Sequence, residues 1–180
     1  MTVIFNTAAI LERAQKIQLL ILDVDGVLTD GRLFFDANGT EYKSFHARDG
    51  HGIKLLQQSG VKVAVISGRK SASVAIRMQN LGIEWVYQGY EQKLSAFEEI
   101  LTALAITPEC VAAVGDDLLD LPILSRVGLA IGVRDAHPLM LEHVHWRTEL
   151  EGGQGAVREV CDLLMQAQGT LAAVVARYLS

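Results

Sequence analysis

Residues 19–31 read LLILDVDGVLTDG, and the rest of the chain is organised around this stretch. The four apolar residues at 19–22 fit a strand that is buried on both faces, as in a parallel sheet. The apolar run ends at Asp23, and Asp25 follows after one residue. Two carboxylates at the end of a buried strand repel each other and are costly to desolvate. A divalent cation removes that cost, and oxygen ligands suit Mg²⁺, so we expect a magnesium site here.

The same carboxylates fit two further roles. A carboxylate can act as a nucleophile toward phosphorus and form an aspartyl-phosphate. A DxD pair also fits an ordinary loop, in which Asp residues cap a helix or fill a turn. The longer string DVDGVLTDG at 23–31 is more specific than the pair alone, so the rest of the chain has to decide between these interpretations.

Length and composition predict one globular domain over residues 1–180. Half of the residues are hydrophobic and the formal net charge is −5, which argues against a nucleic-acid partner because such binders are basic. Cys110 and Cys161 form no CxxC pair and are expected to be buried thiols in a reducing compartment. We see no signal peptide, and the apolar tail at 171–176 is too short to span a membrane. We therefore expect a cytoplasmic protein with no membrane partner.

Strand and helix patterns alternate along most of the chain. Further strands are expected at 61–66, 83–87, 111–114 and 128–131. Helices are expected at 7–18, 93–104, 118–125 and 156–166, and two more helices should stop at Gly60 and near Gly82. This repetition predicts an α/β fold with three layers, in which a doubly wound, Rossmann-like parallel sheet lies between helices.

A protruding β-hairpin is expected at residues 32–45. Strand patterns at 32–35 and 41–45 flank the sequence DANG, and Asn-Gly is a strong hairpin-turn signal. Only this hairpin and one helix separate Asp25 from the next strand, so the chain has no room for a large cap domain. We therefore expect the site of a single chain to be open.

Four polar residues follow the later strands at the positions where a site would form. Ligand sites of open α/β sheets lie outside the carboxyl ends of the strands. Ser67 follows one strand, Lys93 follows the next, and Asp116 and Asp117 follow the third. Each has an ordinary explanation, as a helix N-cap, a solvated helix residue, or charges at the positive end of a helix. Their joint occurrence in this order favours a single shared site.

The order DxDG, Ser, Lys, GDD resembles the four motifs of the haloacid dehalogenase (HAD) phosphatase superfamily, over roughly residues 21–155. The resemblance implies that Asp23 attacks phosphorus, and that Asp25 protonates the leaving oxygen and later activates water. It also implies that Mg²⁺ is held by Asp23, Asp116 and the backbone carbonyl of Asp25.

The same resemblance assigns roles to the remaining motif residues. Ser67, Gly68 and Lys93 would hold phosphoryl oxygens, and Lys93 would also screen the acidic cluster. Asp117 would orient the loop or a metal-bound water.

Longer strings resemble the 3-deoxy-D-manno-octulosonate 8-phosphate (KDO 8-phosphate) phosphatase family within that superfamily. They are FFDANGTEYKSFHARDG, VISGR, GDDLLDLP and GGQGAVREV. The resemblance implies hydrolysis of KDO 8-phosphate for lipopolysaccharide precursor synthesis, by a homotetramer that the hairpins help to build. It implies that the substrate is bound by Asp25, His46, Ala47, Arg48, Asp49, Gly50, Lys54, Ser67, Gly68, Arg69, Arg77 and Lys93.

Basic residues beyond those needed for one phosphate suit a sugar acid, because arginine forks match carboxylates. Arg69 and Arg77 are eight positions apart and share a face if one helix carries both. Lys54 and Arg77 also fit the ordinary explanation of solvated helix residues.

We expect the open site to be completed by a neighbouring subunit. A two-stranded ribbon is marginal alone and its edges invite pairing, so hairpins from several subunits are expected to form a closed barrel. Such a barrel would bury the apolar hairpin residues Leu33, Phe34, Phe35, Tyr42 and Phe45. Residues 46–49 would then cover a neighbour's Asp23, and the apolar tail at 171–179 could reach across in the same way.

Three other functions remain as alternatives. A receiver-type signalling domain also uses an acidic pocket, but its phosphorylated Asp follows a later strand. A catalytically inactive scaffold of the same fold would not need both Asp23 and Asp25. A phosphatase for a nine-carbon keto-sugar acid 9-phosphate is not distinguished from the eight-carbon case by the sequence.

Two further patterns could indicate other binding sites. His143 and His145 could project from one side of a strand as zinc ligands, but no third ligand is near in the sequence. The GGQG sequence at 152–155 could cradle a nucleotide phosphate, but it lacks the Walker lysine. We interpret it as a flexible flap near the site entrance.

Overall fold

The computed structural model describes residues 7–179 and contains a six-stranded sheet with the strand order β5-β4-β1-β6-β7-β8. All five pairings between neighbouring strands are parallel. The strands are β1 Leu19–Leu22, β4 Lys62–Ser67, β5 Trp85–Gln88, β6 Val111–Gly115, β7 Leu129–Gly132 and β8 Trp146–Arg147. Strand β1 lies in the interior of the sheet and is buried along its whole length, as its apolar run predicts.

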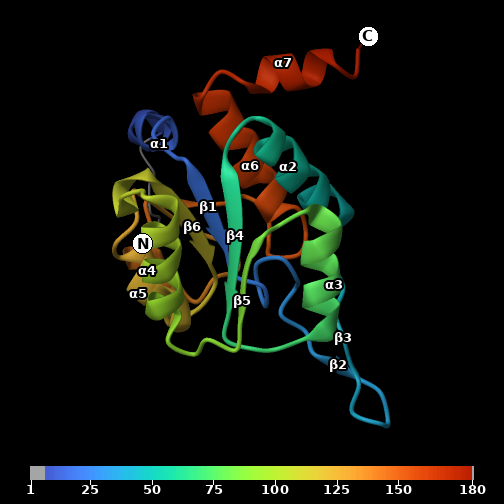
Figure 1. The fold of residues 1–180 in the computed structure, drawn as a ribbon. Coiled ribbons are helices and arrows are strands. Elements are labelled where there is room, and N and C mark those ends of the chain that lie inside the picture. Colours follow the sequence, from blue (N-terminus) through green and yellow to red (C-terminus); the bar gives the residue numbers. More distant parts are fainter. Residues whose placement is uncertain (1–6, 180) are drawn as a thin grey trace.

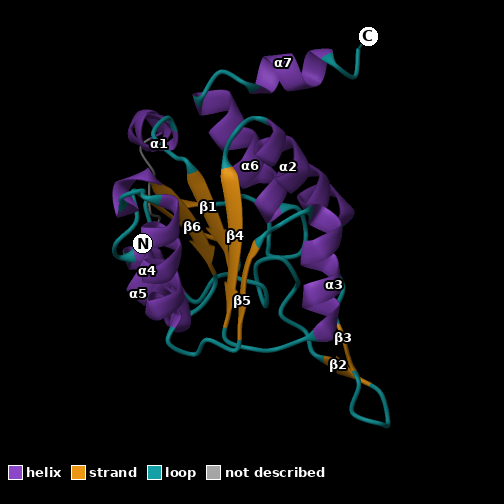
Figure 2. Cartoon of the chain, viewed as in Figure 1, coloured by secondary structure: helices purple, strands orange, loops and turns teal. Residues whose placement is uncertain are grey.

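Helices cover both faces of the sheet and make three layers (Figures 1 and 2). Helices α2, α3 and α6 lie on one face, and α4 and α5 lie on the other. The helices are α1 Thr7–Ala14, α2 Ala47–Gln58, α3 Ala72–Leu81, α4 Lys93–Leu104, α5 Leu121–Leu124, α6 Ala156–Ala167 and α7 Leu171–Ala176. The predicted doubly wound α/β fold is confirmed. Within residues 7–179, none of the helices combines the length and apolarity needed to cross a bilayer.

Local sequence explains where several elements begin and end. Helix α3 ends at Gly82, whose φ of 71° lies in the left-handed region that favours glycine. Helix α6 buries one apolar side, made of Val157, Val160, Cys161 and Leu164, with the spacing of an amphipathic helix. Such local signals agree with the layered fold, so the predicted element types hold along most of the chain.

Two helix boundaries differ from the sequence predictions. Helix α1 ends at Ala14 instead of residue 18, and residues 15–18 turn into β1, where Gln18 N–H donates to the carbonyl of Cys110 at 2.8 Å. Helix α2 begins at Ala47, whereas the apolar positions of its pattern, Ile53, Leu55 and Leu56, lie in its second half. Both differences lie at the ends of helices, where boundaries are least determined by local sequence. For α1, a hydrogen bond to another segment takes the place of the next helical one.

The hairpin forms between β2 Phe34–Phe35 and β3 Glu41–Tyr42, in the register Phe34 opposite Tyr42. Its strands are shorter than predicted, because a ribbon with no sheet beside it has few backbone partners. The turn is held by Asp36, whose Oδ1 accepts from the N–H of Thr40 at 2.8 Å. The hairpin projects from the end of the molecule opposite α7 (Figure 1).

Candidate active site

The site lies where the carboxyl ends of β1, β4 and β6 meet. Asp23 directly follows β1, Ser67 is the last residue of β4, and Asp116 directly follows β6. Strands β4 and β6 pair with opposite sides of β1, so their ends are adjacent. These ends enclose a cavity of about 200 Å³ lined by Asp23, Asp25, Gly31, Ser67, Gly68, Arg69, Lys93, Asp116, Asp117 and Leu119. All of the predicted motif residues therefore meet in one cleft.

Lys93 is the buried cation of this cleft. It is the first residue of α4, and its Nζ lies 2.8 Å from Asp23 Oδ1 and 2.7 Å from Asp120 Oδ1. Burial by itself would lower the pKa of Lys93, but Asp23 and Asp120 outweigh burial and raise it above its ordinary value. Lys93 is therefore a fixed positive charge beside Asp23.

Three carboxylates gather around Lys93 and outnumber its charge. Oxygens of Asp23, Asp116 and Asp120 lie within 4.8 Å of one another. Burial, and then the charges of Asp23, Asp120 and Asp117, raise the pKa of Asp116 to about 8. Burial and the charge of Asp120 also raise the pKa of Asp23, despite its contact with Lys93. Hard oxygen donors that repel one another in this way fit a magnesium ion, which would offset the excess negative charge.

Asp120 was missed by sequence reasoning. Besides contacting Lys93, its Oδ2 accepts from the backbone N–H of Asp116 at 3.0 Å, so it fixes the loop that carries Asp116. A Cβ on Gly115 would lie 2.4 Å from the same Oδ2, so glycine at 115 makes room for this carboxylate. Asp117 is exposed and its Oδ1 accepts from Leu118 N–H at 2.7 Å, a loop contact at the start of the 3-10 helix Leu118–Asp120. The signal that could have found Asp120 is its position four residues after Asp116.

A network at the base of the hairpin was also missed. The Lys43 Nζ contacts Asp25 Oδ1 and lies 3.1 Å from Glu41 Oε1. Arg69 contacts the other oxygen of Glu41, and its Nε lies 3.8 Å from Asp25 Oδ2. Hydrogen bonds from Arg69 and Lys43 overcome the effect of burial and lower the pKa of Glu41. Glu41 and Lys43 lie within the string FFDANGTEYKSFHARDG, but that string assigned no role to either residue.

The remaining predicted substrate residues form a second group outside the cleft lining. Ala47, Arg48 and Lys54 are exposed on α2. Arg77 lies with its guanidinium carbon 5.9 Å from the ring centre of Phe45, which packs on the core. The condition for a shared helical face of Arg69 and Arg77 is not met, because α3 begins only at Ala72.

Asp49 is turned toward the protein interior. It is buried, and its Oδ1 accepts from the N–H of Arg158 in the first turn of α6 at 2.8 Å. Burial raises the pKa of Asp49 above its ordinary value. The neighbouring His46 is half-buried, with Nδ1 at 4.0 Å from Asp49 Oδ2. Gly50 lies against Arg77, since a Cβ there would fall 2.1 Å from its Nη2. Asp49 thus holds α6 in addition to lying in the predicted substrate segment.

The GGQG loop is packed, which corrects the interpretation as a flexible flap. A Cβ on Gly152 would lie 1.7 Å from the carbonyl oxygen of Gly26, and one on Gly153 would lie 2.4 Å from the backbone N of Asp30. Gly153 N–H also donates to Val27 O at 2.9 Å. This loop therefore packs directly on the backbone of the loop that follows Asp25.

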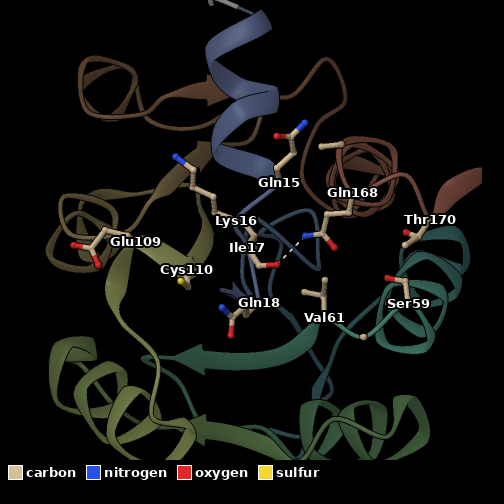
Figure 3. A pocket seen from close by; sticks show the side chains of 12 residues that line it. Gln15, Lys16, Ile17, Gln18, Ser59, Val61, Glu109, Cys110, Gln168 and Thr170 are labelled. Carbon is tan, nitrogen blue, oxygen red and sulfur yellow. Dashed lines mark hydrogen bonds between the residues drawn. The ribbon is translucent and has the colours of Figure 1, made fainter.

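Neither His143 and His145 nor a cavity at the other end of the sheet indicates a second site. His143 and His145 lie outside β8, and neither belongs to a metal-type cluster of the described residues; His145 Nδ1 accepts from Ala130 N–H at 2.9 Å. A cavity of about 840 Å³ lies at the other end of the sheet (Figure 3). There Gln168 Nε2 donates to Ile17 O at 2.8 Å, and the hydroxyls of Ser59 and Thr170 also donate to backbone carbonyls. Three of its polar side chains are thus used by the fold.

The parallel sheet and the four converging motifs define a haloacid dehalogenase-like hydrolase. Residues 48–128 match the family described as haloacid dehalogenase-like hydrolase. The chain is 52% identical to 3-deoxy-D-manno-octulosonate 8-phosphate phosphatase KdsC from Escherichia coli (strain K12) over 165 residues, which is 92% of this chain and 88% of that protein. The chain therefore belongs to the KDO 8-phosphate phosphatase (KdsC) family.

Solved structures agree with this assignment. The KDO 8-phosphate phosphatase from Yersinia pestis superposes with a TM-score of 0.90 at 48% identity, covering 91% of this chain and 89% of that one. The enzyme from Moraxella catarrhalis, solved with magnesium, phosphate and KDO, has a TM-score of 0.94 at 38% identity, covering 96% of this chain and 99% of that one.

Proposed function

We propose that this protein is a magnesium-dependent phosphatase that hydrolyses KDO 8-phosphate to KDO and phosphate. The observation that carries the proposal is the convergence of Asp23, Asp25, Lys93 and Asp116 in one cleft of a chain that belongs to the KdsC family. We also propose a cytoplasmic location, in keeping with two free cysteines, and a role in lipopolysaccharide precursor synthesis.

Asp23 is the proposed nucleophile. Its carboxylate attacks phosphorus while the bond to the sugar oxygen breaks, and an aspartyl-phosphate forms. Asp25 gives a proton to the departing sugar oxygen and then takes one from the water that hydrolyses the intermediate. Lys93, at 2.8 Å from Asp23, keeps the nucleophile oriented and opposes the rise in its pKa, and its charge would face the phosphoryl oxygens.

Asp23, Asp116 and the backbone carbonyl of Asp25 would hold Mg²⁺. When bound, the ion offsets negative charge on the transferring phosphoryl group and on the carboxylates. Ser67 and Gly68 line the same cleft and would hold phosphoryl oxygens together with Lys93, while Asp117 would orient the loop. Asp120 keeps Asp116 and Lys93 in place.

The sugar acid would be recognised by two groups of residues. Arg69 lines the cleft of its own chain and presents a guanidinium to a carboxylate. The second group, at His46 to Gly50, Lys54 and Arg77, would act on the site of a neighbouring subunit within a homotetramer, with the buried Asp49 and Gly50 fixing the position of the segment. The exposed hairpin residues Leu33, Phe34, Phe35 and Tyr42 support an interface at the hairpin.

Phosphate release from a panel of sugar phosphates tests this function. The panel includes KDO 8-phosphate, a nine-carbon keto-sugar acid 9-phosphate and neutral hexose phosphates, each with Mg²⁺ and with a chelator. We expect the eight-carbon acid to have the highest kcat/KM, no turnover with the chelator, and none from a folded Asp23→Asn variant. Full-rate hydrolysis with the chelator, or by Asp23→Asn, contradicts the mechanism.

A further inference from the structure

A closed network of four charges joins the hairpin to the active site. It runs from Asp25 to Lys43, from Lys43 to Glu41, from Glu41 to Arg69, and from Arg69 back to Asp25. Acids and bases alternate, so each charged group lies between two of opposite sign. All four residues belong to one chain, although they come from three separate segments of it.

The strand periodicity places the two hairpin members on one side. Successive side chains of a strand point to opposite faces, so Glu41 and Lys43 share a face and Tyr42 lies on the other. Burial follows this alternation: Glu41 and Lys43 are partly covered, while Tyr42 and Ser44 are exposed. Phe34 lies opposite Tyr42 and shares its face, whereas Phe35 lies opposite Glu41. The hairpin thus has exposed aromatic side chains on both faces, and the face of Glu41 and Lys43 also supplies charges to the site.

Lys43 is the most deeply placed member of the network. Its side chain is only 1% exposed, compared with 21% for Asp25 and 46% for Arg69. A buried ammonium is retained only where its charge and hydrogen bonds are met, and here the partners are two carboxylates. An exposed ion pair would contribute little, but a buried one fixes the positions of its members.

Two contacts of the network, Lys43 with Asp25 and Glu41 with Arg69, serve different chemistry. Lys43 acts on Asp25, the proposed acid and base for every phosphoester that the enzyme hydrolyses. Glu41 acts on Arg69, whose proposed partner is the carboxylate that only a sugar acid carries. Glu41 contacts this guanidinium, and Arg69 lines the same cleft as Lys93.

We propose that Lys43 and Glu41 are positioning residues of the active site of their own chain, with Lys43 orienting Asp25 and Glu41 orienting Arg69. This inference rests on the proposed function. Through it the base of the hairpin acts in catalysis and in substrate selection, separately from the role of the exposed hairpin aromatics in assembly.

Steady-state kinetics of Lys43→Met and Glu41→Gln test the two roles, with KDO 8-phosphate and glycerol phosphate as substrates in the presence of Mg²⁺. Lys43→Met should lower kcat about tenfold or more on both substrates, since both need Asp25. Glu41→Gln should raise KM about tenfold for KDO 8-phosphate and leave glycerol phosphate hydrolysis unchanged within about twofold. Calorimetric binding of KDO should weaken in Glu41→Gln but not in Lys43→Met.

Matched controls are Lys62→Met and Glu98→Gln, which alter exposed residues of β4 and α4. Both should retain wild-type kinetics. A purely structural role of the network predicts a common fall in melting temperature without the split between kcat and KM. If Lys43→Met does not fold, the Glu41→Gln/Lys43→Met double variant loses one acid and one base, keeps the network neutral, and should still show the lower kcat on both substrates.

Mixed oligomers decide whether Lys43 acts within its own chain. Chains with Asp23→Asn and chains with Lys43→Met are co-expressed with different tags and purified as hybrids. If Lys43 serves its own chain, no hybrid site is intact and activity stays at the level of the Lys43→Met chains. Recovery of activity above that level overturns the inference, because it requires Lys43 of one chain to serve another.

The proposed function and this inference fail in different ways. Absence of KDO 8-phosphate hydrolysis by the wild-type enzyme contradicts the function. Hydrolysis by the wild type together with unchanged kinetics in Lys43→Met and Glu41→Gln contradicts the inference alone.

Discussion

At the scale of single residues, Asp120 holds together two parts of the site that lie far apart in the sequence. It contacts Lys93 on α4 and accepts from the backbone of Asp116 after β6. Removing Asp120 leaves Lys93 with Asp23 alone and leaves the Asp116 N–H without its acceptor, and an unsatisfied buried polar group typically costs about 1–3 kcal/mol. We therefore expect Asp120→Ala to lower the free energy of unfolding by about 2 kcal/mol, measured by urea denaturation, and to reduce kcat.

The matched control for this prediction is Asp162→Ala. Asp162 also pairs with a base, Arg158, at 2.9 Å, but on the partly exposed side of one helix. Such pairs contribute about 0.3–0.5 kcal/mol, so the control should be close to neutral. Equal losses in the two variants would contradict the structural role assigned to Asp120.

Asp116 gives a second prediction at this scale, because its pKa in the folded chain is raised from 3.8 to about 8. Between these values the folded state retains a proton that the unfolded state has lost, so stability falls as pH rises. Without metal, the melting temperature should fall between about pH 5.5 and pH 8, by about 2–4 °C for each kcal/mol lost. Mg²⁺ binds the ionised carboxylates, so its stabilising effect should grow over the same interval.

Differential scanning calorimetry with Mg²⁺ and with a chelator, at several pH values, measures this effect. In Asp116→Asn the carboxyl cannot ionise, so both the fall in the chelator series and the magnesium shift should be smaller. A magnesium shift that is independent of pH in the wild type would contradict the prediction.

At the scale of elements, the GGQG loop fixes the position of the loop that carries Asp25. Gly152 has its Cα so close to Gly26 that a Cβ would lie 1.7 Å from the Gly26 carbonyl oxygen. Overpacking of this kind typically costs about 1–3 kcal/mol because backbone has to move. Gly152→Ala should therefore lower the melting temperature and reduce kcat about tenfold or more, since a shift of about 1 Å at a catalytic group is expensive.

Gly132→Ala is the control for this variant. Gly132 is also buried, but a Cβ there would make only ordinary contacts, the nearest at 3.6 Å to a side-chain carbon of Val144. Its kinetics should remain close to wild type. Wild-type kcat in Gly152→Ala would mean that this loop does not determine the geometry of Asp25.

At the scale of the whole molecule, the exposed apolar side chains of the hairpin are the proposed contact between subunits. Phe34 and Phe35 are 48% and 57% exposed, and the two-stranded ribbon has no sheet beside it. Deleting the whole hairpin would also remove Lys43 and the packed Phe45. The better test is Phe34→Ser/Phe35→Ser, which should give smaller species in sedimentation velocity and lower turnover of the sugar acid, with glycerol phosphate hydrolysis retained.

Ile76→Ser provides the control, because Ile76 is 60% exposed on α3 and is not part of the hairpin. It should leave the sedimentation coefficient unchanged. A Phe34→Ser/Phe35→Ser variant that is smaller but retains full selectivity would show that the site does not need a neighbour.

Much of the fold and part of the site could be predicted from local patterns. The apolar run of β1, the glycine after α3 and the polar residue at each strand end are properties of short segments. The parallel α/β rule then brings those strand ends together without knowledge of any side-chain contact. The network of Lys43 and Glu41 could not be found in this way, because short hairpin strands give no motif that indicates which face meets the site.

The sequence by itself therefore determined the α/β fold, the order of the four motifs and the acidic cleft at Asp23 and Asp116, since each follows from hydrophobic periodicity and from topology. Only the tertiary structure decided how the charges pair. Lys43 contacts Asp25 across 18 positions, Lys93 meets Asp120 across 27, and Asp49 caps α6 across 109. The physical reason is that a buried charge must find its partner in space, and the packing of helices and loops on the sheet selects that partner.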